Sequence, residues 1–192
     1  MTKIGSNISR FSSYSCQPKT REDLDEIIGE RIFYQGNNCD LNDIDVSLIT
    51  DMSGLFSDLR FNGDISKWNV SNVKDMYSMF LNSKFNGDIS DWNVSNVIEM
   101  SYMFSDSEFN QPIGDWNVLS VKKMDAMFAR SKFNQDISKW NVSNVKGMGW
   151  MFDNSEFDQD ISNWNISKDC STIRIFRNCP IKEEHKPKAL QK

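Results

Sequence analysis

The sequence predicts an α/β repeat solenoid, and three observations carry that prediction. A tryptophan recurs every 24 residues, the string Trp-Asn-Val-Ser-Asn-Val follows the same register, and spaced Met and Phe residues come after it in each repeat. The periodic tryptophans are Trp68, Trp92, Trp116, Trp140 and Trp164. A fixed period of this length is the signature of stacked coils, each made of one repeat.

The first half of each coil has the pattern of a short parallel β-strand. Trp92 and Val94 are apolar and flank the polar Asn93. Alternation of this kind is typical of a strand with one buried face. We therefore expect the tryptophans to form a structural ladder inside the stack.

The second half of each coil has the pattern of a short helix or 3-10 turn. Val97, Met100, Met103 and Phe104 recur at steps of three and four, which places them on one helical face. Ser95-Asn96 before this stripe supplies capping side chains, and Glu99 follows three residues after Asn96.

About six coils of 24 residues fill residues 44–181, because a weaker repeat precedes Trp68 and a degenerate one follows Trp164. A single coil cannot bury its own apolar face. Stacking places like residues against like and makes one continuous core.

The flanks have other patterns. Residues 1–18 are predicted to form a flexible arm, 19–43 a helical N-terminal cap, and 182–192 a polar, solvated tail. In the cap, Thr20 and Asp23 have the spacing of a helix start. Its inner face is assigned to Leu24, Ile27, Ile28 and either Phe33 or Ile32, and its end to Gln35-Gly36-Asn37-Asn38.

Composition excludes several classes of function. The net charge is −5 and no dense basic cluster occurs, so nucleic acid is not expected as a partner. No apolar stretch is long enough for membrane insertion. The first residues lack the apolar core of a secretory signal. We expect a cytoplasmic protein if Met1 is the native start, and an extracellular or cell-surface protein if a leader was removed.

The repeat Trp-Asn-Val-Ser-Asn-Val-x-x-Met-x-x-Met-Phe, followed by Phe-Asn-x-Asp-Ile-Ser, resembles that of BspA-like leucine-rich-repeat surface proteins. The resemblance covers about residues 18–181. It implies a leucine-rich-repeat-like solenoid that binds proteins or host surfaces, and it supplies no catalytic residues. The third coil departs from the pattern at Gln111-Pro112 and Leu119-Ser120, which predicts a local irregularity there.

The sequence has no residue pattern typical of a catalytic or metal site. The cysteines are Cys16, Cys39, Cys170 and Cys179, and the one histidine is His185. Their spacing does not match a zinc site, and no nucleophile–histidine–acid set or phosphate loop is present. We expect no enzyme activity, no metal and no cofactor. Whether Cys170 and Cys179 pair stays open, although a small buried thiol is the favoured interpretation of Cys179.

Three polar rows have structural explanations beside functional ones. The repeated carboxylates Asp64, Asp88, Asp136 and Asp160 would either cap turns or bind calcium between coils, and turn capping is favoured. The asparagines after the tryptophans form a ladder that includes a glycosylation sequon at Asn69-Val70-Ser71. The alternating charges form a weak salt-bridge ladder, through Arg60, Lys84, Glu108, Lys132 and Glu156.

Three large aromatics break the repeat and are the candidate protein-binding residues: Tyr77, Tyr102 and Trp150. Exposed aromatics on a rigid frame are typical binding anchors, although each could instead cover a neighbouring gap. We expect a non-enzymatic protein–protein binding module, monomeric or weakly self-associating, with a partner of unknown identity. The alternatives are a secreted or surface adhesin or effector that contacts host molecules, and a self-associating structural subunit. Which face binds stays open.

Overall fold

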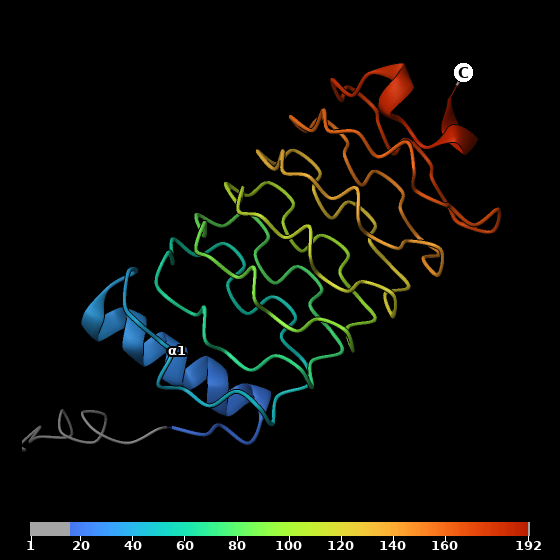
Figure 1. Ribbon diagram of the computed structural model, residues 1–192. Helices are drawn as coiled ribbons and strands as arrows, with labels where there is room; N and C mark the ends of the chain where they lie inside the picture. The colour runs from blue at the N-terminus through green and yellow to red at the C-terminus, as the bar shows by residue number, and fades with distance from the viewer. Residues whose placement is uncertain (1–15, 192) are drawn as a thin grey trace, which may run out of the picture.

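The computed structural model describes residues 16–191, which form one row of stacked coils (Figure 1). Helix α1, Arg21–Gln35, lies across the N-terminal end of the stack. Two short 3-10 helices, η1 (Glu183–His185) and η2 (Lys188–Leu190), lie at the opposite end. The predicted arm of residues 1–18 falls largely outside the described part of the chain.

Neighbouring coils stack in parallel with a register of 24 residues. One isolated parallel bridge joins each coil to the next at the same position, through Asp51, Asp75, Glu99, Lys123, Gly147 and Ser171 in turn. The predicted register of the repeat is therefore the register of the stack.

A run of overlapping turns follows each bridge. In the coil that begins at Trp92, the N–H groups of Met103 and Ser105 donate to the carbonyls of Met100 and Tyr102, three residues back. Every second N–H of the run points to the next coil instead, as when Tyr102 donates to the Asp125 carbonyl at 2.9 Å. The run presents its donors to the following coil and its acceptors to the preceding one.

The predicted strand and helix in each coil are both wrong. Within residues 16–191 the structure contains α1, η1, η2 and isolated bridges, with no β-sheet and no helix inside any coil. The α/β solenoid and its leucine-rich-repeat-like form are therefore corrected to a stack of turn-built coils.

Left-handed residues explain why the helical stripe fails. Tyr102 and Asp106 have φ angles of 60° and 56°, and their equivalents in the other coils are also left-handed. A right-handed helix cannot contain such residues, so the apolar spacing is met by successive turns. Asn96 does not cap a helix either, since its Nδ2 donates to the Ser71 carbonyl at 2.8 Å.

A second turn ends the predicted strand. The Oδ1 of Asn93 accepts the Ser95 N–H at 3.2 Å, and the Val97 N–H donates to the Val94 carbonyl at 3.0 Å. These bonds bend the backbone after Val94, so the alternation of buried and exposed residues extends over too few positions to build a strand ladder.

The tryptophan ladder is confirmed as core. Its five rings are 3–4% exposed, and the Trp68 and Trp92 rings stack with centroids 6.5 Å apart. Each indole Nε1 donates to a carbonyl 27 residues earlier, as Trp116 does to Ile89 at 3.1 Å. Because the indole N–H is satisfied, the ring can be buried without an unpaired donor.

Two phenylalanine rows complete the core. Phe80 and Phe104 stack at 5.5 Å, and Phe85 and Phe109 at 6.2 Å, with ring planes within 4° of parallel. Phe104 and Phe109 also stack within their own coil at 4.1 Å. The rows therefore join the coils both along the stack and across it.

Helix α1 begins and ends as predicted. Thr20 and Asp23 form a capping box, and Gly36 follows the last turn with a φ of 87°, a left-handed value that favours glycine. Leu24 and Ile28 are buried against the first coil. Of the two alternatives for the last inner position, Ile32 packs against the core, whereas Phe33 is 80% exposed.

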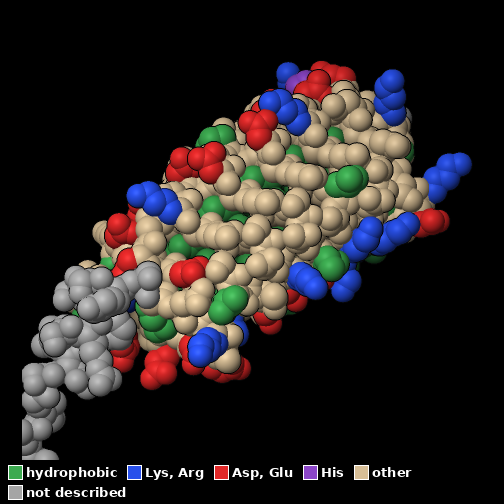
Figure 2. Space-filling model, turned by 60° about the horizontal axis from the view of Figure 1, so that its bottom comes forward, with side chains coloured by type: hydrophobic (Ala, Val, Ile, Leu, Met, Phe, Trp, Pro, Cys, Tyr) green, Lys and Arg blue, Asp and Glu red, His purple; other side chains and the backbone are tan. Residues whose placement is uncertain are grey.

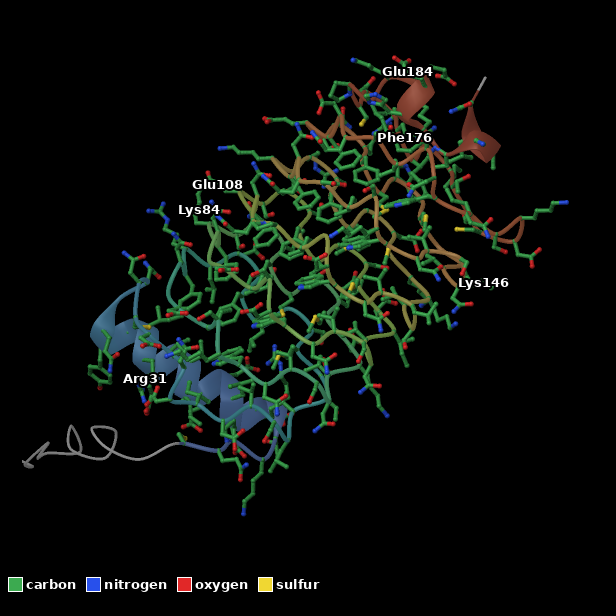
Figure 3. The ribbon with its side chains drawn as sticks, in the orientation of Figure 1. Arg31, Lys84, Glu108, Lys146, Phe176 and Glu184 are labelled. Carbon is green, nitrogen blue, oxygen red and sulfur yellow. The ribbon has the colours of Figure 1, made fainter. Side chains whose placement is uncertain are left out.

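The last described residues pack against the final coil. The His185 carbonyl accepts the Ile161 N–H at 2.9 Å, and Lys186 Nζ lies 6.0 Å from the centre of the Phe176 ring. Figure 3 shows Phe176 beside this segment, near Glu184. These contacts hold the segment on the end of the stack, where a solvated tail was expected.

Candidate protein-binding face

The three candidate aromatics lie on one face, which we call the turn face. It consists of the first two variable residues of each turn run: 77–78, 101–102, 125–126, 149–150 and 173–174. Tyr77 is 45% exposed, Trp150 is 36% exposed and Tyr102 is half-buried.

The structure brings two of the three together. The Tyr77 and Tyr102 rings meet edge to face with centroids 5.7 Å apart. Trp150 lies two coils beyond Tyr102, and Ala126 occupies the equivalent position between them with 4% exposure. The face thus has a tyrosine pair on one side of a small residue and a tryptophan on the other.

The backbone under two of these aromatics is left-handed. Tyr102 and Trp150 have φ angles of 60° and 57°, at a position where the first coil has Gly54. A bulky residue held in this conformation costs on the order of 1–3 kcal/mol. The chain therefore carries large side chains where glycine would be less strained.

Two further residues of the turn face are not found by looking only for aromatic residues that break the repeat. Ile173 is 53% exposed and lies in the coil after Trp150, whose N–H donates to its carbonyl at 2.9 Å. Asp125 accepts the Gly149 N–H through Oδ1 at 2.8 Å. Comparing equivalent positions would have found both, because their rows otherwise contain small residues or a tyrosine.

The Asp125 side chain lies against Gly147 and Gly149 of the next coil. A Cβ atom on Gly147 would lie 2.2 Å from its Oδ2, so only glycine leaves room for this carboxylate. The result is an acidic group between the Tyr102 and Trp150 coils, held by the backbone of its neighbour.

Acidic and basic groups border the turn face at the bridge positions. Burial raises the pKa of Asp75 above its ordinary value, and the charges of Asp51 and Glu99 raise it further, while a hydrogen bond from the Tyr77 N–H acts in the opposite direction. Lys123 Nζ lies 3.3 Å from Glu99 Oε2, so the row of bridge positions contains a basic residue beside its acidic ones.

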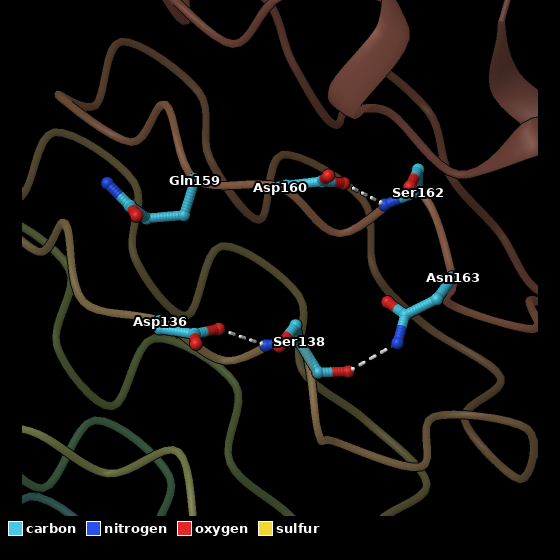
Figure 4. Close-up of a pocket in the computed structure, with 6 residues that line it drawn as sticks. All are labelled: Asp136, Ser138, Gln159, Asp160, Ser162 and Asn163. Carbon is cyan, nitrogen blue, oxygen red and sulfur yellow. Dashed lines mark hydrogen bonds between the residues drawn. The ribbon is translucent and has the colours of Figure 1, made fainter.

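The repeated aspartates cap turns, as favoured. Asp136 and Asp160 accept the N–H groups of Ser138 and Ser162 at 2.8 and 2.9 Å, in an open polar hollow of about 320 Å³ (Figure 4). These hydrogen bonds lower the pKa of both carboxyls. Among residues 16–191 no group of three or more His, Cys, Asp or Glu side chains is arranged to hold a metal ion.

The charge row forms ion pairs at its centre. Glu108 lies 2.7 Å from Lys84 and 3.7 Å from Lys132, and Figure 3 shows Lys84 and Glu108 side by side at the edge of the stack. The two lysine side chains are largely exposed and that of Glu108 is partly exposed, so each pair contributes little to stability.

The four cysteines are free thiols in the structure. Burial raises the pKa of each of them. Cys179 is half-buried, and its Sγ lies 3.0 Å from the Phe157 carbonyl, in a row where the first coil has Leu59 and the four coils between have serine. This agrees with the packing interpretation of Cys179.

The family model described as "Mycoplasma protein of unknown function, DUF285" matches residues 29–132 and 105–187. The chain belongs to this family. The two overlapping matches agree with the repeats in the structure. Together they begin in the middle of α1 and extend through the last coil. The DUF285 description names no activity, and it does not establish the resemblance to BspA-like proteins.

Searches of curated proteins and of solved structures found no match to the chain. In the described residues, no helix has the length and apolar character needed to cross a membrane.

Proposed function

We propose that this DUF285 protein is a non-enzymatic binding module that presents the turn face to a protein partner. The observation that carries the proposal is the size of Tyr102 and Trp150 in a left-handed row, which the other coils fill with Gly54, Ser78, Ala126 and Arg174. Strain retained at large, solvent-accessible side chains is typical of functional positions.

The surroundings of these aromatics suit a protein surface. Tyr77, Trp150 and Ile173 offer apolar area that the stack leaves exposed. Asp125 and the bridge-position charges offer polar groups around it. Apolar anchors within a polar rim are the usual composition of protein interfaces, and tryptophan and tyrosine are enriched among their strongest contributors.

The test compares capture of partners from cells of the source organism by three baits. They are the wild-type chain, the Tyr102→Gly/Trp150→Gly variant, and the control Leu119→Ala, which removes an exposed apolar residue outside the turn face. We expect wild type and control to retain the same protein and the glycine variant to lose it. The dissociation constant of the purified pair should rise at least tenfold, which corresponds to about 1.4 kcal/mol.

A second candidate function is contact with host molecules at a cell surface. The support is the resemblance of the tryptophan repeats to BspA-like surface proteins, together with the same exposed aromatics. Labelling of intact source cells with an impermeant reagent separates the two. Labelled protein favours the surface role, and protein that is labelled only after lysis favours an internal partner.

A further inference from the structure

The two ends of the stack carry opposite charge. Residues 19–64 contain four Lys or Arg and eleven Asp or Glu, a net charge of −7. Residues 165–192 contain seven Lys or Arg and three Asp or Glu, a net charge of +4. Figure 2 shows acidic side chains near the N-terminal end and basic ones along the edge that leads to the other end. The molecule is therefore a charged dipole along its long axis.

The acidic end has an ordered stripe on α1. Glu22, Glu26 and Glu30 are exposed, stand four residues apart, and form no ion pair within residues 16–191. Like charges at this spacing destabilise a helix by about 0.2–0.5 kcal/mol per pair. The stripe leads to Phe33 and Tyr34, which are 80% and 74% exposed and in edge-to-face contact with each other.

The opposite end offers unpaired donors. In the last coil the N–H groups of Thr172, Arg174, Phe176 and Asn178 have no acceptor among the described residues, whereas their equivalents in earlier coils all donate to the next coil. The carbonyls between them accept from the coil before, as Ile173 does from Trp150. This edge thus presents donors and no competing acceptors.

Unpaired cations lie in the last coil and in the segment that follows it. Lys168, Arg174, Lys182 and Lys188 are exposed and form no ion pair in the described part of the chain. Two such ends cannot pair with each other, because donors would face donors and cations would face cations. Their complement is a surface with carboxylates, and the α1 stripe is one.

We propose that copies of this chain associate head to tail, with the outer face of α1 in one copy against the 172–178 edge of the last coil and the adjoining η1–η2 segment of the next. The Glu22, Glu26 and Glu30 carboxylates receive the free N–H groups and the lysines, and Phe33 and Tyr34 lose solvent exposure. Each copy keeps one free end of each kind, so the contact extends to a chain of copies rather than closing as a dimer.

Sedimentation velocity of the 192-residue chain over a concentration series tests the proposal. At about 0.01 M ionic strength, where charges act over roughly 30 Å, the average mass should rise with concentration; at about 1 M, where they act over roughly 3 Å, it should fall to that of the monomer. A monomer at every concentration in low salt overturns the proposal.

Charge reversal identifies the surfaces. Glu26→Lys/Glu30→Lys and Lys168→Glu/Lys182→Glu should each be monomeric. The first gives the α1 stripe the same sign as the cations it would meet, and the second leaves the other end with no net charge. Their equimolar mixture should associate again, since each variant then complements the other. Circular dichroism spectra and melting temperatures confirm that both variants are folded.

Two controls keep the result specific. Asp91→Lys/Glu156→Lys makes the same change in net charge on the sides of the stack and should associate as wild type does. Trp150→Gly should also associate normally, which separates this contact from the proposed partner site. Association that survives Glu26→Lys/Glu30→Lys, or that is lost in either control, contradicts the head-to-tail arrangement.

Discussion

Arg177 holds Asp153 of the preceding coil with two hydrogen bonds, from Nε at 2.5 Å and from Nη2 at 2.6 Å. The two residues occupy equivalent positions 24 residues apart, and Asp153 is 2% exposed. The guanidinium holds the pKa of the carboxyl below its ordinary value. One row of the stack thus contains a buried carboxylate whose ion pair is with Arg177, and the Asn154 amide donates one further hydrogen bond to it at 2.9 Å.

Removing Arg177 should destabilise the chain more than its partial exposure suggests. Arg177→Ala leaves a buried carboxylate without its counter-ion, at a cost of about 1–3 kcal/mol. Asp153→Ala/Arg177→Ala should recover most of this loss, because Ala129 fills the same position one coil earlier. Urea denaturation at pH 7 measures both. A double variant no more stable than the single one would contradict the explanation.

The period-breaking tryptophan and the ladder tryptophans should differ sharply in stability effects. Trp116→Ala removes a buried ring and its bond to the Ile89 carbonyl, and should cost about 3–5 kcal/mol. Trp150→Ala removes an exposed ring and should change the free energy of unfolding by less than about 1 kcal/mol. Equal losses in thermal and urea denaturation would show that Trp150 is core.

Asp75→Asn should stabilise the chain at neutral pH. The folded-state pKa of Asp75 is raised, so its favourable contribution is present below the unfolded pKa of about 3.9 and is lost as pH rises through the folded value. The amide keeps the acceptor for the Tyr77 N–H but carries no charge. The gain in melting temperature at pH 7 should therefore disappear near pH 3.

Asp88→Asn is the matched control for that experiment. Hydrogen bonds from Ser90 lower the pKa of Asp88, so its contribution is present above the unfolded pKa and is lost as pH falls through the folded value. The same substitution should slightly lower the melting temperature at pH 7. Shifts of the same sign for both variants would contradict the assigned pKa directions.

The register of the stack and its core were predictable from the sequence, because periodic apolar residues must meet their equivalents in the next coil. The conformation of each coil was not. Met100, Met103 and Phe104 have helical spacing, and only the recurrence of Gly54, Asn82, Asp106 and Asn154 in the two left-handed rows signals turns.

Contacts that do not repeat from coil to coil could not be predicted from the sequence either. The Arg177–Asp153 pair joins two residues that break the pattern, so no periodic argument connects them. The candidate aromatics could be named from their departure from the repeat, whereas the proximity of Tyr77 and Tyr102 follows from turn geometry. The choice between Ile32 and Phe33 depends on which side of α1 meets the first coil, and both residues are apolar, so their character alone leaves the choice open.

The most direct test of the proposed binding role is the affinity of the captured partner for Tyr102→Gly/Trp150→Gly. Glycine relieves the left-handed strain at both positions, so the melting temperature should stay at or above that of wild type. We predict this intact fold together with at least a tenfold loss of affinity by titration calorimetry, while Leu119→Ala binds normally. Wild-type affinity in the folded glycine variant would show that the turn face is not the binding surface.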